Sequence, residues 1–403
     1  MFSRREKIAN ESFAVWWVPG VKTPLEMMKP FNLTLGIALL AFSFGCTTTR
    51  NNSAVERKIE AVQEKFAPDR HLAIFKVEFE PNGSGVVLRG EVDNAAAKQE
   101  LVRSVSEVSP HVIDEVTLLP DKNLGDKTFG ITVVSAACSR EEPSPGAELG
   151  TQVLLGNTFK IWKSKGAWSY VQSKDGYLGW MERDQFITCT SQEADSWNSA
   201  TRVIVTIDAD HVWQNREKTL PVCDVVPGCV LKKMDADHGF IRVQLADGRE
   251  GYIAETSVTD LTEWNKSRKP TADNIEKTAK SLLGVPYLWG GTSTKMLDCS
   301  GFTKTVFYLN GIELLRNASH QVHQGTPIEA GKNFENLRKG DLIFFGNRRD
   351  GTLKIRHVGI YLQDGLFIHS SGLVHISSLY KDSDLRDDAR IASFIAARRV
   401  LPQ

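Results

Sequence analysis

One cysteine and two histidines in the last third of the chain are the residues best suited to chemistry. Cys299 follows Asp298, a residue type that caps helices, and Phe302 and Val306 come after it at helical spacing. We therefore expect Cys299 in the first turn of a helix, where free N–H groups and the helix dipole favour a thiolate. Such a position is expected to lower the thiol pKa from ~8.5 toward ~3.5–7.5. A nucleophilic cysteine is the hypothesis that follows.

A nucleophilic cysteine needs a base and a residue that orients the base. His357 and His369 lie in two alternating apolar runs, 369 − 357 = 12 residues apart, with a Gln363-Asp364-Gly365 turn between them. Adjacent antiparallel strands would place the two imidazoles side by side. His357 would then accept the thiol proton, and His369 would fix its tautomer. A lone cysteine or strand histidine is more often a core residue, so the hypothesis depends on the combination.

Four sequence blocks together resemble the NlpC family of bacterial cell-wall cysteine peptidases, which have a papain-like fold. The blocks are Pro-Tyr-x-Trp-Gly-Gly from 286, Asp-Cys-Ser-Gly-Phe from 298, His-Val-Gly-Ile-Tyr from 357 and Ile-His-Ser from 368. The resemblance covers roughly residues 271–400, about a third of the chain. It implies a nucleophile, a base, a third polar residue and a tyrosine that stabilises the oxyanion: Cys299, His357, His369 and Tyr287.

The same resemblance implies substrate contacts at Asp298, Ser300 and Ser319. His320 and His323 lie three residues apart, as metal ligands can, but no third ligand of suitable spacing accompanies them. We therefore expect no metal and no cofactor.

The composition is that of a globular protein with several domains. The 403 residues are 41% hydrophobic and 24% charged, and Lys+Arg and Asp+Glu both number 49. This length leaves room for about three or four domains. Zero net charge argues against nucleic acid as the main partner, and we expect a monomer.

The N-terminal region, residues 1–45, is interpreted as an upstream extension and a lipoprotein signal. The apolar run from Phe31 to Gly45, about 15 residues, is shorter than the roughly 20 that a membrane-spanning helix needs, but fits a secretory signal. It ends at Cys46 in Ser-Phe-Gly-Cys, which resembles a lipoprotein cleavage box. Lipidation of Cys46 and simple cleavage both remain open, and we favour lipidation. Residues 46–52 are expected to be a linker in a periplasmic or outer-membrane lipoprotein.

Residues 53–122 are predicted to form a small α/β module. Ser53 and Glu56 match a capping box, and an apolar stripe at helical spacing follows. The later runs predict the order αββαβ, which weakly resembles the BON domains of periplasmic proteins. With no catalytic constellation in it, we interpret the module as a spacer or an envelope-attachment module.

Residues 128–192 and 200–262 repeat each other with an offset of 72. Trp-Ser-Tyr-Val-Gln from 168 corresponds to Phe-Ile-Arg-Val-Gln from 240, and an Asp-Gly turn follows each, at 175 and 247. Short alternating runs separated by such turns predict two small antiparallel β-barrels. Both resemble bacterial SH3-type domains, the usual companions of NlpC-type peptidases.

The two copies differ at Glu148 and Tyr177, whose counterparts are Leu220 and Arg249. A carboxylate and a phenol together can bind a protonated amine, although on chemistry alone a solvated loop glutamate and a core tyrosine are favoured. The resemblance extends to NlpC-type enzymes with two SH3-type domains, the γ-D-glutamyl-L-diamino acid endopeptidases. It implies that an equivalent Glu and Tyr hold a free N-terminal L-alanine.

Four further cysteines lie in the two copies, and two disulfides are considered in an oxidising envelope. Cys223 and Cys229 flank a Pro-Gly turn and are the favoured pair over Cys138 and Cys189. We expect an α+β hydrolase whose peptidase domain spans residues 270–401. Its expected substrate is a murein stem peptide with a free L-Ala amine, cut between γ-D-Glu and the L-diamino acid. The alternatives are a cross-link endopeptidase on intact peptidoglycan and a non-catalytic wall-binding protein.

Overall fold

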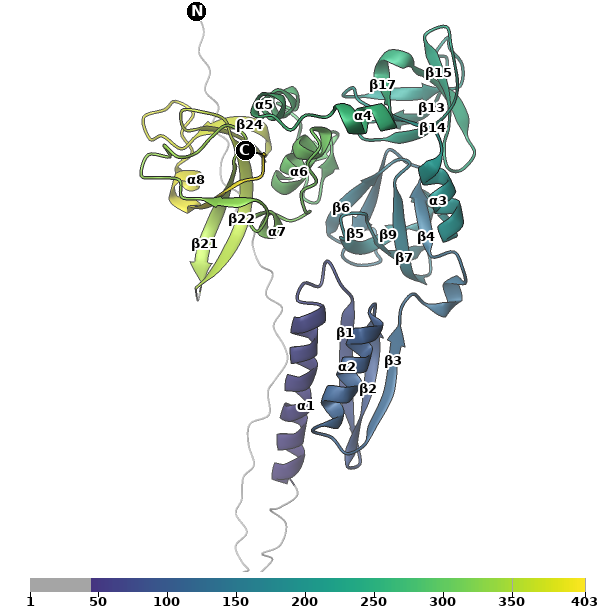
Figure 1. The fold of residues 1–403 in the computed structure, drawn as a ribbon, viewed down its shortest axis with the longest axis vertical. Coiled ribbons are helices and arrows are strands. Elements are labelled where there is room, and N and C mark those ends of the chain that lie inside the picture. Colours follow the sequence, from purple (N-terminus) through teal and green to yellow (C-terminus); the bar gives the residue numbers. More distant parts are fainter. Residues whose placement is uncertain (1–44, 350, 403) are drawn as a thin grey trace, which may run out of the picture. The chain divides into compact units, whose positions relative to one another are not determined.

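The computed structural model describes residues 45–349 and 351–402 and has the expected α+β class. An N-terminal module comes first (Figure 1). Its elements are α1 (Gly45–Phe66), β1 (Phe75–Asn82), β2 (Gly85–Val92), α2 (Ala95–Ser106) and β3 (Val112–Leu118). The central strand β2 pairs antiparallel with β1 and parallel with β3. The predicted αββαβ order is therefore confirmed.

Two local expectations for this module are wrong. Helix α1 begins at Gly45, so Ser53 lies inside the helix instead of capping it, and residues 46–52 are helical instead of forming a linker. The segment between Gly45 and Ser53 contains no proline that would stop the helix. The buried stripe is nevertheless as expected, since Val55, Ile59 and Val62 all belong to the module's core.

Two seven-stranded sheets follow, and they share one topology. Barrel 1 consists of β4 (Phe129–Thr132), β5 (Ala136–Arg140), β6 (Leu149–Leu154), β7 (Thr158–Lys165), β8 (Trp168–Gln172), β9 (Leu178–Glu182) and β10 (Phe186–Cys189). Barrel 2 consists of β11 (Arg202–Val205), β12 (Asp210–Trp213), β13 (Pro221–Val225), β14 (Val230–Asp237), β15 (Phe240–Gln244), β16 (Glu250–Ala254) and β17 (Val258–Asp260). The order β10-β4-β7-β8-β9-β5-β6 is reproduced as β17-β11-β14-β15-β16-β12-β13. The bounds of β7, β8 and β9 recur in β14, β15 and β16 with the predicted offset of 72.

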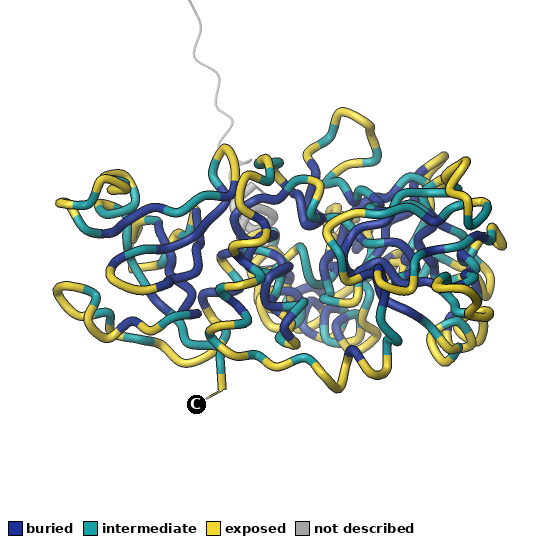
Figure 2. The backbone as a smooth tube through the Cα atoms, turned by 90° about the horizontal axis from the view of Figure 1, so that it is seen from above, coloured by how far each residue is buried: buried dark blue, intermediate teal, exposed yellow. Residues whose placement is uncertain are grey.

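Short helices accompany the barrels. Helix α3 (Ser191–Ser199) follows barrel 1, and α4 (Leu261–Ser267) follows barrel 2. Three 3-10 turns lie at Lys122–Leu124, Arg183–Gln185 and Glu255–Ser257. Each barrel has its own buried core, and buried residues run along the strands while exposed residues occupy the loops (Figure 2).

The C-terminal region packs helices on a six-stranded antiparallel sheet. Its strands are β20 (Thr326–Ile328), β21 (Leu342–Arg349), β22 (Thr352–Tyr361), β23 (Leu366–Ser371), β24 (Leu373–Ser378) and β25 (Phe394–Arg399), in the order β20-β25-β21-β22-β23-β24. The helices are α5 (Ala272–Ser281), α6 (Cys299–Leu309), α7 (Ala318–Gln321) and α8 (Asp388–Ser393), and a small hairpin is formed by β18 (Thr292–Ser293) and β19 (Met296–Leu297).

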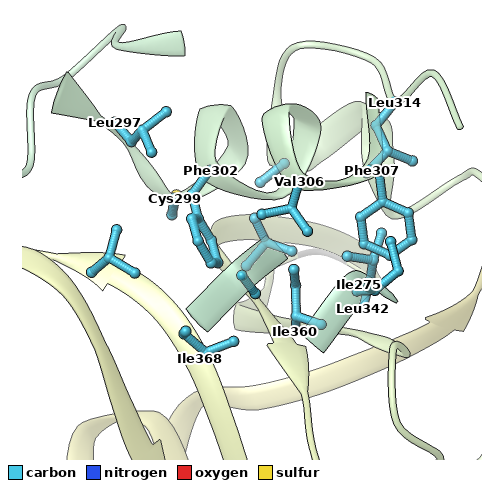
Figure 3. Close-up of a cluster of buried hydrophobic side chains, with 14 of the residues drawn as sticks. Ile275, Leu297, Cys299, Phe302, Val306, Phe307, Leu314, Leu342, Ile360 and Ile368 are labelled. Atoms are coloured by element: carbon cyan, nitrogen blue, oxygen red, sulfur yellow. The ribbon is translucent and has the colours of Figure 1, made fainter. Parts of the chain in front are cut away.

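Helix α6 is held against this sheet by its apolar face. Phe302 and Val306 are fully buried and point toward Ile360 on β22 and Ile368 on β23 (Figure 3). Burial of a large apolar side chain stabilises the fold by about 1.5–3 kcal/mol relative to exposure. The predicted periodicity after Cys299 is confirmed, and this packing fixes the helix that presents the thiol.

The N-terminal module docks on barrel 1 through a buried aromatic cluster. Ile74 and Leu119 of the module pack against residues of β7, β8 and β9, namely Trp162, Trp168, Tyr170, Leu178 and Trp180. Lys163 of barrel 1 forms an ion pair with Glu91 of β2. Because aromatic side chains bury large areas, this interface holds the module in one position on barrel 1.

The expected Cys223–Cys229 disulfide is wrong. Among the described residues Cys138, Cys189, Cys223, Cys229 and Cys299 are all free thiols. The Cys229 thiol instead donates to the Ser135 carbonyl at 3.4 Å and accepts from the Val226 N–H.

The proposed signal lies outside the described residues, and the Cys46 side chain is not described. Within residues 45–349 and 351–402, no helix has the length and apolar character needed to cross a membrane.

Candidate active site

Cys299 occupies the first turn of α6, as predicted, but its electrostatic environment differs from the expectation. The thiol is 7% exposed. Burial raises the pKa of the Cys299 thiol to about 11, and the Asp298 carboxylate adds to the rise. Hydrogen bonding from the Val358 and Ser300 N–H groups opposes this, as does the charge of Arg316, without outweighing burial. The expected lowering of the thiol pKa is therefore wrong, because desolvation exceeds the helix-terminus effect.

Asp298 organises the start of this helix. Its Oδ1 accepts from the Gly301 N–H at 2.7 Å, the capping bond, and its Oδ2 accepts from the Gly290 N–H at 2.9 Å. Arg316 forms a buried ion pair with both oxygens. Although burial disfavours a charged guanidinium, Asp298 holds the pKa of Arg316 above its ordinary value. Breaking one partner of a buried pair typically costs about 3–5 kcal/mol, so this pair fixes the position of Cys299.

Two glycines let the loop before β18 approach helix α6 and barrel 1 closely. A Cβ on Gly301 would lie 1.9 Å from the Gly291 carbonyl oxygen, and one on Gly290 would lie 2.1 Å from the Leu149 carbonyl oxygen of barrel 1. Both distances are far inside any real contact. The Gly-Gly and Ser-Gly pairs of the motif are therefore required by close backbone approach.

The two histidines form the predicted pair. His357 on β22 and His369 on β23 place Nε2 and Nδ1, respectively, 2.7 Å apart, with ring planes at 90°. His369 Nε2 lies 3.1 Å from the Ser377 hydroxyl on β24. Burial lowers the pKa of His357 well below 6.5, and burial lowers the pKa of His369 to about 3. Both imidazoles are therefore neutral at pH 7.

This chain of contacts assigns the tautomers. For Nδ1 of His357 to take up a proton, its Nε2 must carry hydrogen and donate to Nδ1 of His369. His369 then carries hydrogen on Nε2 and donates to the Ser377 oxygen. The Val358 N–H contacts the Cys299 sulfur, which brings the thiol to the strand that carries His357. The arrangement suits transfer of a thiol proton to a neutral base.

Of the other predicted site residues, Tyr287 is near the thiol, Ser300 is buried and Ser319 is exposed. Burial, and then the Cys299 group, raise the pKa of Tyr287 to about 12, so its hydroxyl remains a donor. Ser300 is buried; its hydroxyl donates to Asp298 and accepts from Arg316. Ser319 is exposed on α7.

Barrel 1 docks directly on the loop before the nucleophile. The Glu148 carboxylate accepts from Trp289 Nε1 at 2.6 Å. Gln152 on β6 joins β18 by exchanging backbone and side-chain hydrogen bonds of 3.0–3.1 Å with Thr292. The pairing of barrel 1 with the peptidase region therefore uses Glu148 as a structural acceptor.

The carboxylate beside Tyr177 is Glu141, not Glu148. The Tyr177 hydroxyl donates to Glu141 Oε1 at 3.4 Å and also bonds the Asn317 side chain, next to Arg316. Burial, with the Glu141 charge, raises the pKa of Tyr177. The expected pairing of Glu148 with Tyr177 is therefore wrong. Glu141 and Glu148 face each other across one hairpin, linked by a 2.9 Å backbone hydrogen bond, so sequence position alone did not separate them.

Several residues of the site were missed from sequence. They are Glu141, Arg316, Ser377 and His375, whose ring lies 4.4 Å from that of His369. Arg316 had one usable signal, since Asp298 carries a charge in an apolar stretch and requires a partner when buried. Ser377 had none, because hydroxyl residues are common at strand positions.

The comparisons with known proteins agree with this architecture. The model of the NlpC/P60 family matches residues 284–386, and that of the bacterial dipeptidyl-peptidase SH3 domain matches residues 140–186. The chain belongs to the NlpC/P60 family of cysteine peptidases.

Its relatives include enzymes with a stated specificity. A gamma-D-glutamyl-L-lysine dipeptidyl-peptidase of Bacillus cereus is 32% identical over 263 residues, covering 63% of this chain and 76% of the relative. A protein of the same name from Bacillus subtilis is 30% identical over 229 residues, covering 55% and 71%. The crystal structure of an NlpC/P60 family protein from Bacillus cereus has a TM-score of 0.59 and 28% identity, and covers 68% of this chain and 100% of that chain.

Proposed function

We propose that this peptidase hydrolyses peptidoglycan stem peptides with a free N-terminal L-Ala, between γ-D-Glu and the L-diamino acid. The observation that carries the proposal is the pair of Glu141 and Tyr177 beside Asn317 and Arg316, since Arg316 is ion-paired with the residue that caps the Cys299 helix. The names of the relatives from Bacillus cereus and Bacillus subtilis support the same specificity.

In the proposed reaction Cys299 Sγ attacks the γ-carbonyl carbon of D-Glu. The thiol proton passes to Nδ1 of His357, and the carbonyl oxygen gains negative charge that the Tyr287 hydroxyl and the Cys299 N–H stabilise. When the C–N bond breaks, His357 returns the proton to the leaving amine. Water then attacks the thioester, loses its proton to His357 and releases the dipeptide acid while the thiol is restored. Asp298 and Ser300 position Cys299.

The proposed specificity comes from the amine. A free α-ammonium group beside Glu141 and Tyr177 forms a charge-assisted hydrogen bond that an acylated or muramyl-linked alanine cannot form. Such a bond contributes about 1.5–3 kcal/mol, or roughly 10- to 100-fold in kcat/KM. An acylated substrate would also desolvate the partly exposed Glu141 carboxylate without adding a cation, which increases the difference.

The test is hydrolysis of L-Ala-γ-D-Glu-L-Lys compared with its N-acetyl derivative, with products identified by mass spectrometry. We expect cleavage after γ-D-Glu and a kcat/KM at least about tenfold higher on the free peptide. Equal rates would contradict the proposal and favour the cross-link endopeptidase. The same assay with a diaminopimelate peptide decides which diamino acid is preferred.

We further propose a bacterial envelope location, with the chain anchored as a monomer through lipid on Cys46. The apolar run that ends at Cys46 supports this proposal. The expressed wild type should partition with membranes, and Cys46→Ser should be released or keep its signal. A soluble wild type with a free amine at residue 46 would refute lipidation.

A further inference from the structure

The loop between α1 and β1, residues 69–72, lies against the Tyr177–Glu141 pair. The His71 ring stacks on the Tyr177 ring, with centroids 5.3 Å apart and planes 15° apart. The His71 carbonyl accepts from the Leu178 N–H at 2.8 Å, and the Leu72 carbonyl accepts from Gln172 Nε2 at 2.9 Å. The N-terminal module therefore reaches the pair that we propose binds the substrate amine.

The loop is held from three sides, so its position is defined. The aromatic cluster around Ile74 anchors its C-terminal end to barrel 1. Asp69 forms an ion pair with His320 on α7, in the peptidase region. Its His71 and Leu72 carbonyls accept from the Leu178 N–H and the Gln172 side chain, and these bonds fix its centre. A loop restrained in this way can act as a fixed wall beside the Tyr177–Glu141 pair.

The hydrogen bonds of Asp69 orient the His71 ring. Asp69 Oδ1 accepts from the His71 backbone N–H at 2.8 Å and lies 3.1 Å from His71 Nδ1. Although burial disfavours its charge, the hydrogen bonds from His71 and His320 lower the pKa of Asp69, which keeps it an acceptor. With its hydrogen on Nδ1 directed at Asp69, the His71 ring presents Nε2 as an acceptor.

His71 Nε2 lies 3.8 Å from Glu141 Oε1, which leaves room for one donor group to contact both atoms. The other carboxylate oxygen, Oε2, lies 3.7 Å from the exposed Arg70 guanidinium. Tyr177 donates its hydrogen to Oε1, and its oxygen, which bonds the Asn317 side chain, keeps one lone pair as an acceptor. An ammonium group has three N–H donors, which match three acceptors: Glu141 Oε1, Tyr177 Oη and His71 Nε2.

We propose that the N-terminal module completes the amine-binding site and that His71 is a specificity-determining residue. His71 Nε2 accepts one N–H of the substrate ammonium, and Asp69 orients the ring. The ring also excludes any group that extends the substrate beyond the amine. This inference rests on the proposed function, and it gives the module a role in recognition instead of spacing.

The test compares His71→Phe with His71→Gln in the full chain. Phenylalanine keeps a ring against Tyr177 but has no acceptor, whereas glutamine restores an acceptor. On L-Ala-γ-D-Glu-L-Lys we expect about a tenfold loss of kcat/KM for His71→Phe, carried by KM. His71→Gln should stay within about threefold of wild type. His238→Phe in barrel 2, where His238 is 81% exposed, serves as the control without effect.

The N-acetyl peptide separates the inference from the proposed function. If wild type prefers the free peptide and His71→Phe lowers that preference, the inference holds. If wild type and Glu141→Gln differ but His71→Phe equals wild type, the inference fails while the proposed function stands. Equal wild-type rates on both peptides overturn both. Should His71→Phe lower the melting temperature, His71→Leu provides a second acceptor-free variant, and restored KM in His71→Gln alone supports the acceptor role.

Discussion

Barrels 1 and 2 have the same fold but use corresponding positions for different purposes. Tyr177 is 4% exposed and bonds Glu141, whereas its counterpart Arg249 is partly exposed and pairs with Asp247. Arg249 Nη2 also donates to the Val133 carbonyl at 2.6 Å, which links barrel 2 to the segment that joins β4 and β5. The position at which Tyr177 bonds Glu141 in barrel 1 is therefore occupied in barrel 2 by an arginine that connects the two barrels.

The two barrels also differ at the hairpin between β5 and β6 and at its counterpart between β12 and β13. Glu148 contacts Trp289, while its counterpart Leu220 is 58% exposed. Gln152 bonds the peptidase hairpin at Thr292, and its counterpart Asp224 pairs with Lys295. The two copies of one fold thus make different contacts with the peptidase region, because the framework strands tolerate changes in the loops.

The largest expected effect is at the Cys299 thiol. Cys299→Ala should lower kcat by about 10⁴-fold or more, because no thioester can form. Cys223→Ala, a free thiol of barrel 2, should leave turnover unchanged. Peptide hydrolysis by purified proteins measures both. Undiminished turnover by Cys299→Ala would end the cysteine-peptidase mechanism.

The next effect separates the two glutamates of the barrel 1 hairpin. Glu141→Gln should lower kcat/KM on the free stem peptide by roughly 10- to 100-fold, since the charged hydrogen bond is lost. Glu148→Gln should change it less than about threefold, because an amide oxygen still accepts from Trp289. Rates on free and acetylated peptides test this. A larger loss with Glu148→Gln would return the amine site to that residue.

A third prediction contrasts a buried histidine with an exposed one. Burial depresses the pKa of His369 in the folded chain to about 3. As the pH falls below 6.5, the unfolded chain therefore takes up a proton that the folded chain does not. Stability is lost progressively between pH 6.5 and pH 3. From pH 7 to 5 this site alone should cost about 2 kcal/mol.

Urea unfolding of wild type and His369→Gln at both pH values measures the difference. The variant should lose about 2 kcal/mol less than wild type over this interval, while His238→Gln should behave as wild type. An identical acid response of His369→Gln and wild type would contradict the neutral, buried state of His369.

The smallest expected effect is at the contact between Arg249 of barrel 2 and Val133 of barrel 1. Arg249→Ala removes the hydrogen bond to Val133 and the partly exposed ion pair with Asp247, so we expect a loss of about 1 kcal/mol in stability. Hydrolysis and the preference for a free amine should not change, and Leu220→Ala should be silent in both assays. A changed amine preference in Arg249→Ala would show that barrel 2 takes part in recognition.

The sequence predicted what depends on neighbours along the chain. The capped helix at Cys299, the two histidine strands and the 72-residue repeat all followed from local periodicity and turn residues. Predictions failed where the answer depended on burial or on contacts between distant segments. The predicted lowering of the Cys299 thiol pKa was wrong because Phe302 and its neighbours desolvate the start of the helix. Glu141 was missed because the folded position of the Tyr177 hydroxyl decides which of the two hairpin glutamates it bonds.

The depth of the Cys299 thiol has a consequence for oxidative damage. Peroxide oxidises thiolates that are accessible, and the rate follows both ionisation and exposure. A thiol that is 7% exposed with a pKa of about 11 satisfies neither condition at neutral pH. Since burial also makes His357 a weak base, we expect the nucleophile to resist sulfenic acid formation. The burial that disfavours ionisation of the Cys299 thiol therefore also protects this thiol between turnovers.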